Sequence, residues 1–554
     1  VLIYDQTCAA EKRRRRKRGK LADPDRRVVI NELVCEGCGD CGVQSNCVAI
    51  VPRETEFGRK RAIDQSSCNK DMSCLKGFCP SFVTVHGPRP HARSIDTDFD
   101  LPAPVLPELD GDYAILVTGV GGTGVVTIAA LIAMAAHLEG KGVGAIDMAG
   151  LAQKGGPVTS HIRIAPTPAG ITAIRVAAGG ADALLACDMV VAGSARALAA
   201  INPGRTHAFV NTHETYPGEF THDPDLTLPT RRLIQAITER AGAGQTDVIE
   251  ATRIATALLG DSIATNMFML GLALQSGAIP VSAAAIERAI ELNGVDIAMN
   301  KAAFAWGRRA AVDRKAVTEA AERRAGRTIE PGPQDIDTLI ERRVAFLTGY
   351  QNAAYAKRYA EAVAEIRVAE QRAMPGRDDL SVAAARGLFK LMAAKDEYEV
   401  ARLFTDASFE RQLRGEFASW DKLEFHLAPP LFARTDPKTG HLVKSNFGPW
   451  MRTGFRVLAG LKRLRGTPLD PFGRSPDRRL ERRLLAEYRE TLQQIAGGLN
   501  AGNHAAAVAL ARYPELIRGY GHIRVAAAEK AAAEKANRLE AFLSPRAPAA
   551  VAAE

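Results

Sequence analysis

The stretch between Val34 and Pro80 holds seven of the nine cysteines, at spacings that favour metal binding. A triple run with Cys-x2-Cys-x2-Cys spacing matches the spacing that binds three corners of a cubane [4Fe–4S] cluster, whose fourth ligand often precedes a proline. Zinc ribbons use paired Cys-x2-Cys knuckles instead, so a structural zinc site fits less well, and disulfides are a further alternative. The candidate ligands are Cys35, Cys38, Cys41, Cys47, Cys68, Cys74 and Cys79.

The cysteine stretch resembles a two-lobed ferredoxin, although it is one cysteine short of the eight that two clusters require. In the ferredoxin pattern Cys79, before Pro80, completes the cluster of the triple run. The remaining three cysteines then hold a second cluster that lacks one ligand. Alternatively, Cys47 completes the first cluster and Cys79 has another role. The sequence therefore predicts one [4Fe–4S] cluster and leaves a second one open.

A glycine-rich turn lies between a predicted strand at Ala114–Thr118 and a predicted helix at Val125–Leu138. Its glycines, in a G-x-G-x-x-G pattern, allow a sharp turn and a close approach to a phosphate at the helix N-terminus. Asp147, which ends the next predicted strand, could accept a ribose hydroxyl of a dinucleotide. Tight packing of the strand on the helix explains the same glycines. The turn residues are Gly119, Gly121, Gly122 and Gly124.

A second polar stretch runs from Gln153 to Arg163 and enters another predicted strand. It either faces an acidic ligand or is an ordinary loop and strand edge. Its candidate ligand-facing residues are Lys154, Gly155, Gly156, Ser160, His161 and Arg163.

Proline content and hydrophobic patterning divide the chain into segments. Residues 1–27 hold a short strand and a basic loop, and residues 28–87 form the cysteine module between β-like flanks at Val28–Val34 and Phe82–Val85. Residues 88–110 form a proline-rich linker. An α/β domain (111–325), a mostly helical domain (326–530) and a tail (531–554) follow, so the fold class is multidomain. We find no internal repeat.

Within the α/β domain, helical stretches separate most of the apolar strands, which predicts a mostly parallel Rossmann-like sheet. The turn at Pro166–Gly170 marks an antiparallel hairpin inserted in it. In the helical domain we expect a cap near Asp335 and a hairpin-like insert around residues 423–444. The further predicted strands are Val143–Asp147, Val158–Ile164, Ile171–Val176, Met189–Ala192, Ala208–Asn211 and Val248–Ala251.

The charge of the chain is concentrated near its start. The net charge is +9, and most of it comes from the run Lys12–Lys20, which has no aromatic residue interleaved for base stacking. We therefore expect a solvated or interfacial basic loop and no nucleic acid, with a zinc-bearing nucleic-acid binder as the rival interpretation. The sequence has no apolar run of membrane-spanning length and no signal peptide pattern, and its cysteines favour a reducing cytoplasm.

The order of these features resembles the C-terminal half of the large fused indolepyruvate ferredoxin oxidoreductases, which belong to the thiamine-dependent 2-oxoacid:ferredoxin oxidoreductases. Residues 4–16 resemble the end of that family's thiamine diphosphate-binding domain. Thr118–Val126 and Gln153–Gly156 resemble its pyruvate/ketoisovalerate oxidoreductase γ-domain, although smaller γ-subunits have arginine where this chain has Lys154. The helical end resembles the family's C-terminal extension. The resemblance disfavours a dinucleotide, because γ-domains do not require one.

The resemblance implies oxidative decarboxylation of an aryl-pyruvate to an acyl-CoA, with ferredoxin as the electron acceptor. It places thiamine diphosphate and magnesium in a region upstream of Val1, so we expect a truncated chain that has no catalytic residue of its own and is inactive alone. The cysteines would pass electrons to ferredoxin, and the glycine-rich turn or Lys154 would meet the phosphates of coenzyme A. The family also implies a homo-oligomer of the full-length protein.

Overall fold

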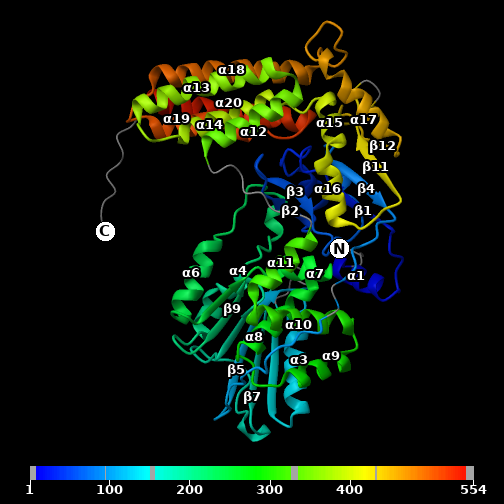
Figure 1. Ribbon diagram of the computed structural model, residues 1–554, viewed down its shortest axis with the longest axis vertical. Coiled ribbons are helices and arrows are strands. Elements are labelled where there is room, and N and C mark those ends of the chain that lie inside the picture. The colour runs from blue at the N-terminus through cyan, green and yellow to red at the C-terminus, as the bar shows by residue number, and fades with distance from the viewer. Residues whose placement is uncertain are drawn as a thin grey trace, which may run out of the picture.

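The computed structural model describes residues 8–93, 95, 97–149, 156–325, 335–430 and 433–544. Figure 1 shows a layer of long helices above and an α/β domain below, with the cysteine module between them. None of the described helices combines the length and apolarity needed to cross a membrane. The expected strand at the start of the chain lies outside the described residues.

The cysteine module is built from short strands joined by the loops that carry the cysteines. The flanking strands β1 and β4 pair antiparallel, with Val28 opposite Thr84, and β2 pairs with β3 in a separate two-stranded sheet. The predicted flank at Phe82–Val85 is confirmed, whereas the first strand ends at Ile30 rather than Val34. The elements are β1 (Arg26–Ile30), α2 (Asp40–Ser45), β2 (Ile50–Arg53), β3 (Lys60–Ile63), η1 (Ser73–Lys76) and β4 (Phe82–His86).

The sheet of the cysteine module continues into the C-terminal region. Strand β11 (Lys422–Leu427) pairs antiparallel with β4, placing Phe425 opposite Val83, and β12 (Ser445–Phe447) pairs with β11. One apolar core joins side chains of β1 and β4 to helices of the C-terminal region, including Val29, Val85 and Phe404. The cysteine module therefore buries apolar surface against the helical domain.

The α/β domain contains a six-stranded sheet in the order β10-β9-β8-β5-β7-β6. Strands β10, β9, β8 and β5 are parallel, whereas β7 runs antiparallel to both β5 and β6. The mostly parallel sheet is therefore confirmed. The strands are β5 (Tyr113–Val120), β6 (Gly142–Ala149), β7 (Pro157–Ala165), β8 (Ala183–Ala186), β9 (His207–Asn211) and β10 (Thr246–Ile249).

Two of the predicted strands are wrong. Met189–Ala192 forms the short helix α4, because Asp188 caps it by accepting a hydrogen bond from the backbone of Val191, and the strand lies just upstream at β8. Residues 171–176 form bends. The antiparallel hairpin is formed by β6 and β7, and the turn at Pro166–Gly170 is a single 3-10 turn, η2 (Pro168–Gly170), after β7.

Helices cover both faces of this sheet because successive residues of a strand point to opposite sides. Ile115 and Val117 of β5 pack into the larger core, and Ala114 and Leu116 pack into the smaller one. The larger core contains α3 (Val125–Leu138), α7 (Ala251–Leu259), α8 (Thr265–Gln275), α9 (Ala283–Asn293), α10 (Ile297–Val312) and α11 (Arg314–Ala325), and the smaller core contains α4, α5 (Ala195–Ala200) and α6 (Thr230–Ala241). The predicted helix at Val125–Leu138 is confirmed with the same bounds.

The C-terminal region is mostly helical, as predicted. Asp335 caps its first helix by accepting a hydrogen bond from the backbone of Thr338. The predicted hairpin insert is confirmed as the β11–β12 pair. The helices are α12 (Ile336–Tyr350), α13 (Ala353–Ala373), α14 (Asp379–Met392), α15 (Glu397–Thr405), α16 (Ala407–Glu416), α17 (Met451–Gly460), α18 (Pro476–Gly498), α19 (His504–Ala511) and α20 (Gly521–Leu543), with short 3-10 turns η5 (Leu461–Leu464) and η6 (Tyr513–Leu516).

The basic run forms a helix rather than the expected loop. Helix α1 spans Ala9–Lys17, and Glu11 in its first turn pairs with Arg14 and Arg15. Two further arginines reach the cysteine module, where Arg13 donates to the carbonyl of Ser66 and Arg16 to that of Asn69. Several arginines of the basic run therefore form contacts within the chain.

Candidate functional site

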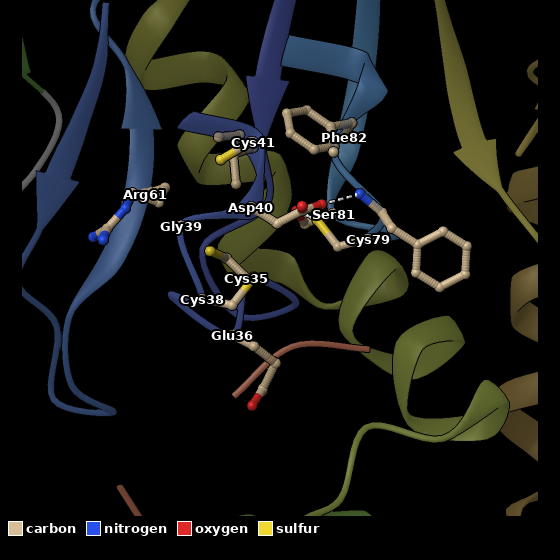
Figure 2. Close-up of a pocket in the computed structure, with 13 residues that line it drawn as sticks. Cys35, Glu36, Cys38, Gly39, Asp40, Cys41, Arg61, Cys79, Ser81 and Phe82 are labelled. Carbon is tan, nitrogen blue, oxygen red and sulfur yellow. Dashed lines mark hydrogen bonds between the residues drawn. The ribbon is translucent and has the colours of Figure 1, made fainter. Parts of the chain in front are cut away.

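Four of the seven cysteines line one cavity. Figure 2 shows Cys35 and Cys38, on the loop between β1 and α2, and Cys41, in the first turn of α2, facing the same space as Cys79, which precedes β4. Phe82 closes the cavity on one side, and Arg61 of β3 lies on the other. The chain thus brings the triple run together with the cysteine that precedes Pro80, in the grouping that the ferredoxin pattern implies.

The other three cysteines form a second group. Cys74 is buried in the same small core as the first group, with Cys47 and Cys68 packed against it. Burial raises the pKa of Cys68, and the neighbouring Cys47 raises it further. Cys47 is not among the residues that line the cavity of the first group.

The described cysteines form no disulfide and no compact group of sulfurs. Within the described part of the chain, no disulfide joins two cysteines, and no three cysteine sulfurs lie within 4.8 Å of one another. A tetrahedral zinc site with bonds of about 2.3 Å holds its sulfurs about 3.8 Å apart. The described sulfurs are therefore not arranged as a compact tetrahedral zinc site.

Burial makes Cys41, Cys74 and Cys79 hard to ionise. Burial raises the pKa of Cys79 to about 11, and Cys35 adds to the shift. Burial likewise raises the pKa of Cys74 to about 12, with Cys68 adding to it, and it raises that of Cys41 well above the usual thiol range. A bound metal supplies positive charge that deprotonates its thiol ligands. The donor set therefore suits a cationic cluster.

Hydrogen-bond donors and cations surround the first group. The backbone N–H of Gly37 donates to Cys35 Sγ at 3.3 Å, and Ser81 Oγ lies 2.9 Å from Cys79 Sγ. Lys444 Nζ donates to the carbonyl of Gly77 and lies 4.9 Å from the centre of the Phe82 ring. Such donors and charges stabilise the more negative, reduced state of an iron–sulfur cluster.

Residues of the helical domain hold the cysteine loop in place. Lys395 Nζ donates to the carbonyls of Val34 and Cys35 and pairs with Glu36 at 2.5 Å. Burial opposes ionisation of Glu36, but Lys395 and Lys60 outweigh it and lower the pKa of this carboxyl to about 2. Lys60 belongs to the cysteine module itself, but Lys395 lies far from the cysteines along the chain, so no local pattern could reveal its contact.

The α/β domain contacts the opposite side of the cysteine module. Arg61 Nη2 donates to the carbonyl of Pro224 at 2.7 Å, and its guanidinium lies 4.7 Å from the centre of the Phe220 ring. Thr221 Oγ1, at the end of η3 (Gly218–Thr221), donates to the side chain of Asn46 beside α2. The first cysteine group therefore lies between the α/β domain and the helical domain.

The glycine-rich turn has the sharp backbone that its sequence predicts. Gly122 and Gly124 adopt positive φ values of 88° and 94°, and Gly124 is the N-cap of α3. The N–H of Gly121 donates to the carbonyl of Gly156, which joins the two predicted loops. Lys154 and Gly155 lie outside the described residues. The side chain of Asn266, on α8, donates a hydrogen bond to the carbonyl of Thr123 and so holds the turn in place.

The acidic residue of the dinucleotide-binding pattern, Asp147, does not lie next to the glycine-rich turn in the sheet. Strand β6, which carries Asp147, is separated from β5 by β7. Asp147 accepts a hydrogen bond from Ser160. In a dinucleotide-binding fold the acidic residue ends the strand beside the one that carries the glycines. The turn therefore has the shape to approach a phosphate but lacks the ribose partner proposed from the sequence.

The polar residues of β7 do not converge on one ligand. Ser160 and His161 are adjacent on a strand and so point to opposite faces. The Nδ1 of His161 accepts from the backbone of Val176, and Arg163 pairs with Asp112. The described residues of this stretch therefore do not form a shared acidic-ligand site, and β7 is an interior strand paired with both β5 and β6.

Comparison with known families locates two matches on the chain. Residues 114–310 match the model of the family described as pyruvate ferredoxin/flavodoxin oxidoreductase. Residues 336–537 match a family of unknown function, DUF6537. The first match covers the sheet and helices of the α/β domain, and the second covers most of the helical region together with β11 and β12.

The chain is also similar to characterised relatives over the α/β domain. It is 29% identical to indolepyruvate oxidoreductase subunit IorB of Pyrococcus horikoshii, covering 36% of this chain and 96% of the relative. It is 30% identical to the same subunit of Methanothermobacter thermautotrophicus, covering 31% of this chain and 82% of the relative.

Among solved structures, pyruvate oxidoreductase subunit PORC of Thermotoga maritima is 23% identical, with a TM-score of 0.27, and the match covers 37% of this chain and 97% of that chain. The match to the IorB subunits over most of their length places the glycine-rich turn in a γ-type domain. The chain belongs to the 2-oxoacid:ferredoxin oxidoreductase family.

Proposed function

We propose that this chain is the electron-transfer and γ-type portion of an oxidoreductase that converts an aryl-pyruvate to an acyl-CoA and passes the electrons to ferredoxin. Cys35, Cys38, Cys41 and Cys79 would hold a [4Fe–4S] cluster. The observation that carries the proposal is the convergence of these four cysteines on one cavity beside a γ-type domain.

The contacts between the two parts support a shared function. The N–H of Ser262 donates to Ser66 Oγ at 3.1 Å, which links η4 (Ser262–Ala264) to the loop before Cys68. The next residue, Ile263, borders Gly124 of the glycine-rich turn. A ligand at the turn would therefore lie close to the second cysteine group, at the junction of the two parts.

The residues of the chain have distinct roles in this proposal. A bound cluster supplies one-electron transfer with little structural rearrangement. Arg61 and Lys444 offset the negative charge of the reduced site, and the helical domain buries the cysteine loop away from water. The free N–H groups at the start of α3, with Gly121–Gly124, would bind the phosphates of coenzyme A. Lys154, outside the described residues, would assist from the facing loop.

Substrate and partners follow from the family. The relatives are named as indolepyruvate oxidoreductase subunits, so an aryl-pyruvate is the proposed 2-oxoacid. Cleavage of the 2-oxoacid requires a domain that binds thiamine diphosphate and magnesium, which we assign to another part of the complex. The proposed setting is cytoplasmic, as a homo-oligomer of the assembled protein, with no nucleic acid or membrane partner.

A direct test follows the cluster absorbance in the complex of this chain with the thiamine diphosphate-binding region. Indolepyruvate with coenzyme A should bleach it, whereas NADH should leave it unchanged. Cys38→Ala should abolish bleaching, and Cys187→Ala, in the α/β core away from both cysteine groups, should retain it. Bleaching by NADH alone would support the alternative in which the glycine-rich turn binds a dinucleotide. Oxidation of an aryl-pyruvate by this chain alone would contradict the proposal that 2-oxoacid cleavage takes place in another part of the complex.

A further inference from the structure

The two cysteine loops are structural repeats of each other, offset by 33 residues. The N–H of Cys35 donates to the carbonyl of Asn31 at 2.9 Å, and that of Cys68 donates to Asp64 at 3.0 Å. The next contact repeats as well: the N–H of Gly37 donates to Cys35 Sγ and that of Lys70 donates to Cys68 Sγ, both at 3.3 Å. This repeat was not detected in the sequence.

The backbone conformation repeats in the same register. Gly37 and Gly39 have positive φ values of 69° and 83°, and their counterparts Lys70 and Met72 have values of 54° and 62°. Left-handed backbone is costly for long side chains and persists only where the surrounding structure imposes it. The second lobe thus retains the geometry of a ligand loop despite the strain.

This register places Asp71 at the position of Cys38. In the first lobe the middle ligand lies between Cys35 and Cys41, and in the second Asp71 lies between Cys68 and Cys74 with the same separations. A helical turn then begins two residues after each of them, α2 at Asp40 and η1 at Ser73. The sequence signal is Cys-x2-Asp-x2-Cys.

The Asp71 side chain has a local contact of its own. The N–H of Ser73, two residues downstream, donates to Asp71 Oδ1 at 3.1 Å. Asp71 is exposed, and a carboxylate has about four lone-pair positions, so this contact leaves it able to bind a cation.

The three cysteines of the second lobe also lie in one place. Cys74 is buried in the small core of the module, and Cys47 and Cys68 are packed against that core.

We propose that Cys47, Cys68, Asp71 and Cys74 form a second iron–sulfur site, in which the Asp71 carboxylate binds the fourth iron. The inference rests on the proposed iron–sulfur function of the module. Carboxylate oxygen is a harder ligand than thiolate and holds cluster iron less tightly. The iron at Asp71 is therefore the exchangeable one. When an oxidant such as ferricyanide accepts one electron from the [4Fe–4S]2+ form of the second site, this iron leaves as Fe2+ and a [3Fe–4S]+ form remains, while the first site keeps four irons.

The test compares iron content and electron paramagnetic resonance of the anaerobically reconstituted full chain before and after mild oxidation with ferricyanide. The wild-type chain should lose about one iron per chain and gain the signal of an oxidised three-iron cluster. Asp71→Ala should show that signal before oxidation, and Asp71→Cys should resist the loss. Asp23→Asn, which removes an exposed carboxylate paired with Lys70, should behave as wild type.

Two results would overturn the inference while leaving the first site intact. One is an Asp71→Ala chain with the iron content and spectra of wild type. The other is an Asp71→Cys chain that loses iron as readily as wild type, a comparison that remains decisive if Asp71→Ala does not fold. A wild-type chain with no iron or sulfide at either site would instead refute the proposed function itself.

Discussion

Lys395 of the helical domain donates from Nζ to the carbonyl oxygen of Cys35 at 3.0 Å, and so fixes the loop that carries the first cysteine group. The same ammonium pairs with Glu36, and both side chains are largely buried. The helical domain, whose family has no assigned function, therefore acts at least as a structural support for the cysteine module.

Replacing Lys395 with methionine should loosen this support. The substitution leaves Glu36 buried without its partner, which typically costs about 3 kcal/mol. We expect hydrogen exchange in β1 and β4 to become faster, to the extent that a loss of about 3 kcal/mol in the free energy of opening predicts. Lys357→Met, which removes an exposed lysine paired with Glu361, is the matched control and should change protection by less than about 0.5 kcal/mol.

The same pair gives a pH dependence. Because the pKa of Glu36 is about 2 in the folded chain, its stabilising contribution is complete above the unfolded pKa of about 4.3 and is lost as the pH falls toward 2. The difference between wild type and Lys395→Met should therefore shrink below about pH 4. A difference that stays constant into acid would show that Glu36 is not the group involved.

Removing iron should unfold the cysteine module selectively. Its own small core contains all seven cysteines but Cys38, together with a few apolar residues such as Ile50, whereas the α/β domain has two cores without cluster ligands. Treatment with an iron chelator under reducing conditions should raise hydrogen exchange in β2, β3 and the cysteine loops while β5 and α3 stay protected. Simultaneous loss of protection in both domains would argue against this independence.

Lys444 should raise the reduction potential of the first cluster. Its ammonium lies beside Gly77 and the Phe82 ring, close to Cys79, where positive charge favours the reduced state. Lys444→Met should lower the potential by on the order of 50 mV in a redox titration. The control Lys438→Met, on an exposed loop, should leave the potential unchanged. An equal shift in both variants would indicate a long-range charge effect.

Gly124→Ala should disturb the glycine-rich turn by crowding as well as by backbone strain. A Cβ at Gly124 would approach Asn266 Nδ2 to 2.8 Å, whereas at Gly140, which also has positive φ, it would meet no atom within 4 Å. We expect both alanine variants to lose about 1 kcal/mol from strain. Only Gly124→Ala should also raise the KM for coenzyme A. An equal effect of Gly124→Ala and Gly140→Ala on this KM would show that the glycine-rich turn is not part of the coenzyme A site.

The sequence was sufficient for features set by local chemistry. The helix Val125–Leu138 follows a glycine N-cap and was predicted with its observed bounds. The grouping of Cys79 with the triple run was one of the two pairings that the ferredoxin-like spacing and the adjoining proline left open, and the four cysteines line one cavity. Both depend on residues that are close together or that match a short pattern.

The sequence was insufficient where distant segments decide the structure. The strand predicted at Met189–Ala192 is a helix, because Asp188 caps it. The strand itself, β8, lies a few residues upstream. The pairing of β11 with β4 joins segments more than three hundred residues apart and leaves no local trace. The position of Asp71 as a candidate ligand follows from the sequence spacing, because Cys68, Asp71 and Cys74 are spaced like Cys35, Cys38 and Cys41. A pattern made of cysteines alone does not include it.

The central claim, that Cys35, Cys38, Cys41 and Cys79 hold an iron–sulfur cluster, is tested most directly by metal and acid-labile sulfide analysis of the anaerobically purified chain. We predict iron and sulfide with little zinc, and a loss of about four irons per chain in Cys38→Ala relative to Cys187→Ala. Zinc without sulfide, or equal iron in these two variants, would contradict the claim.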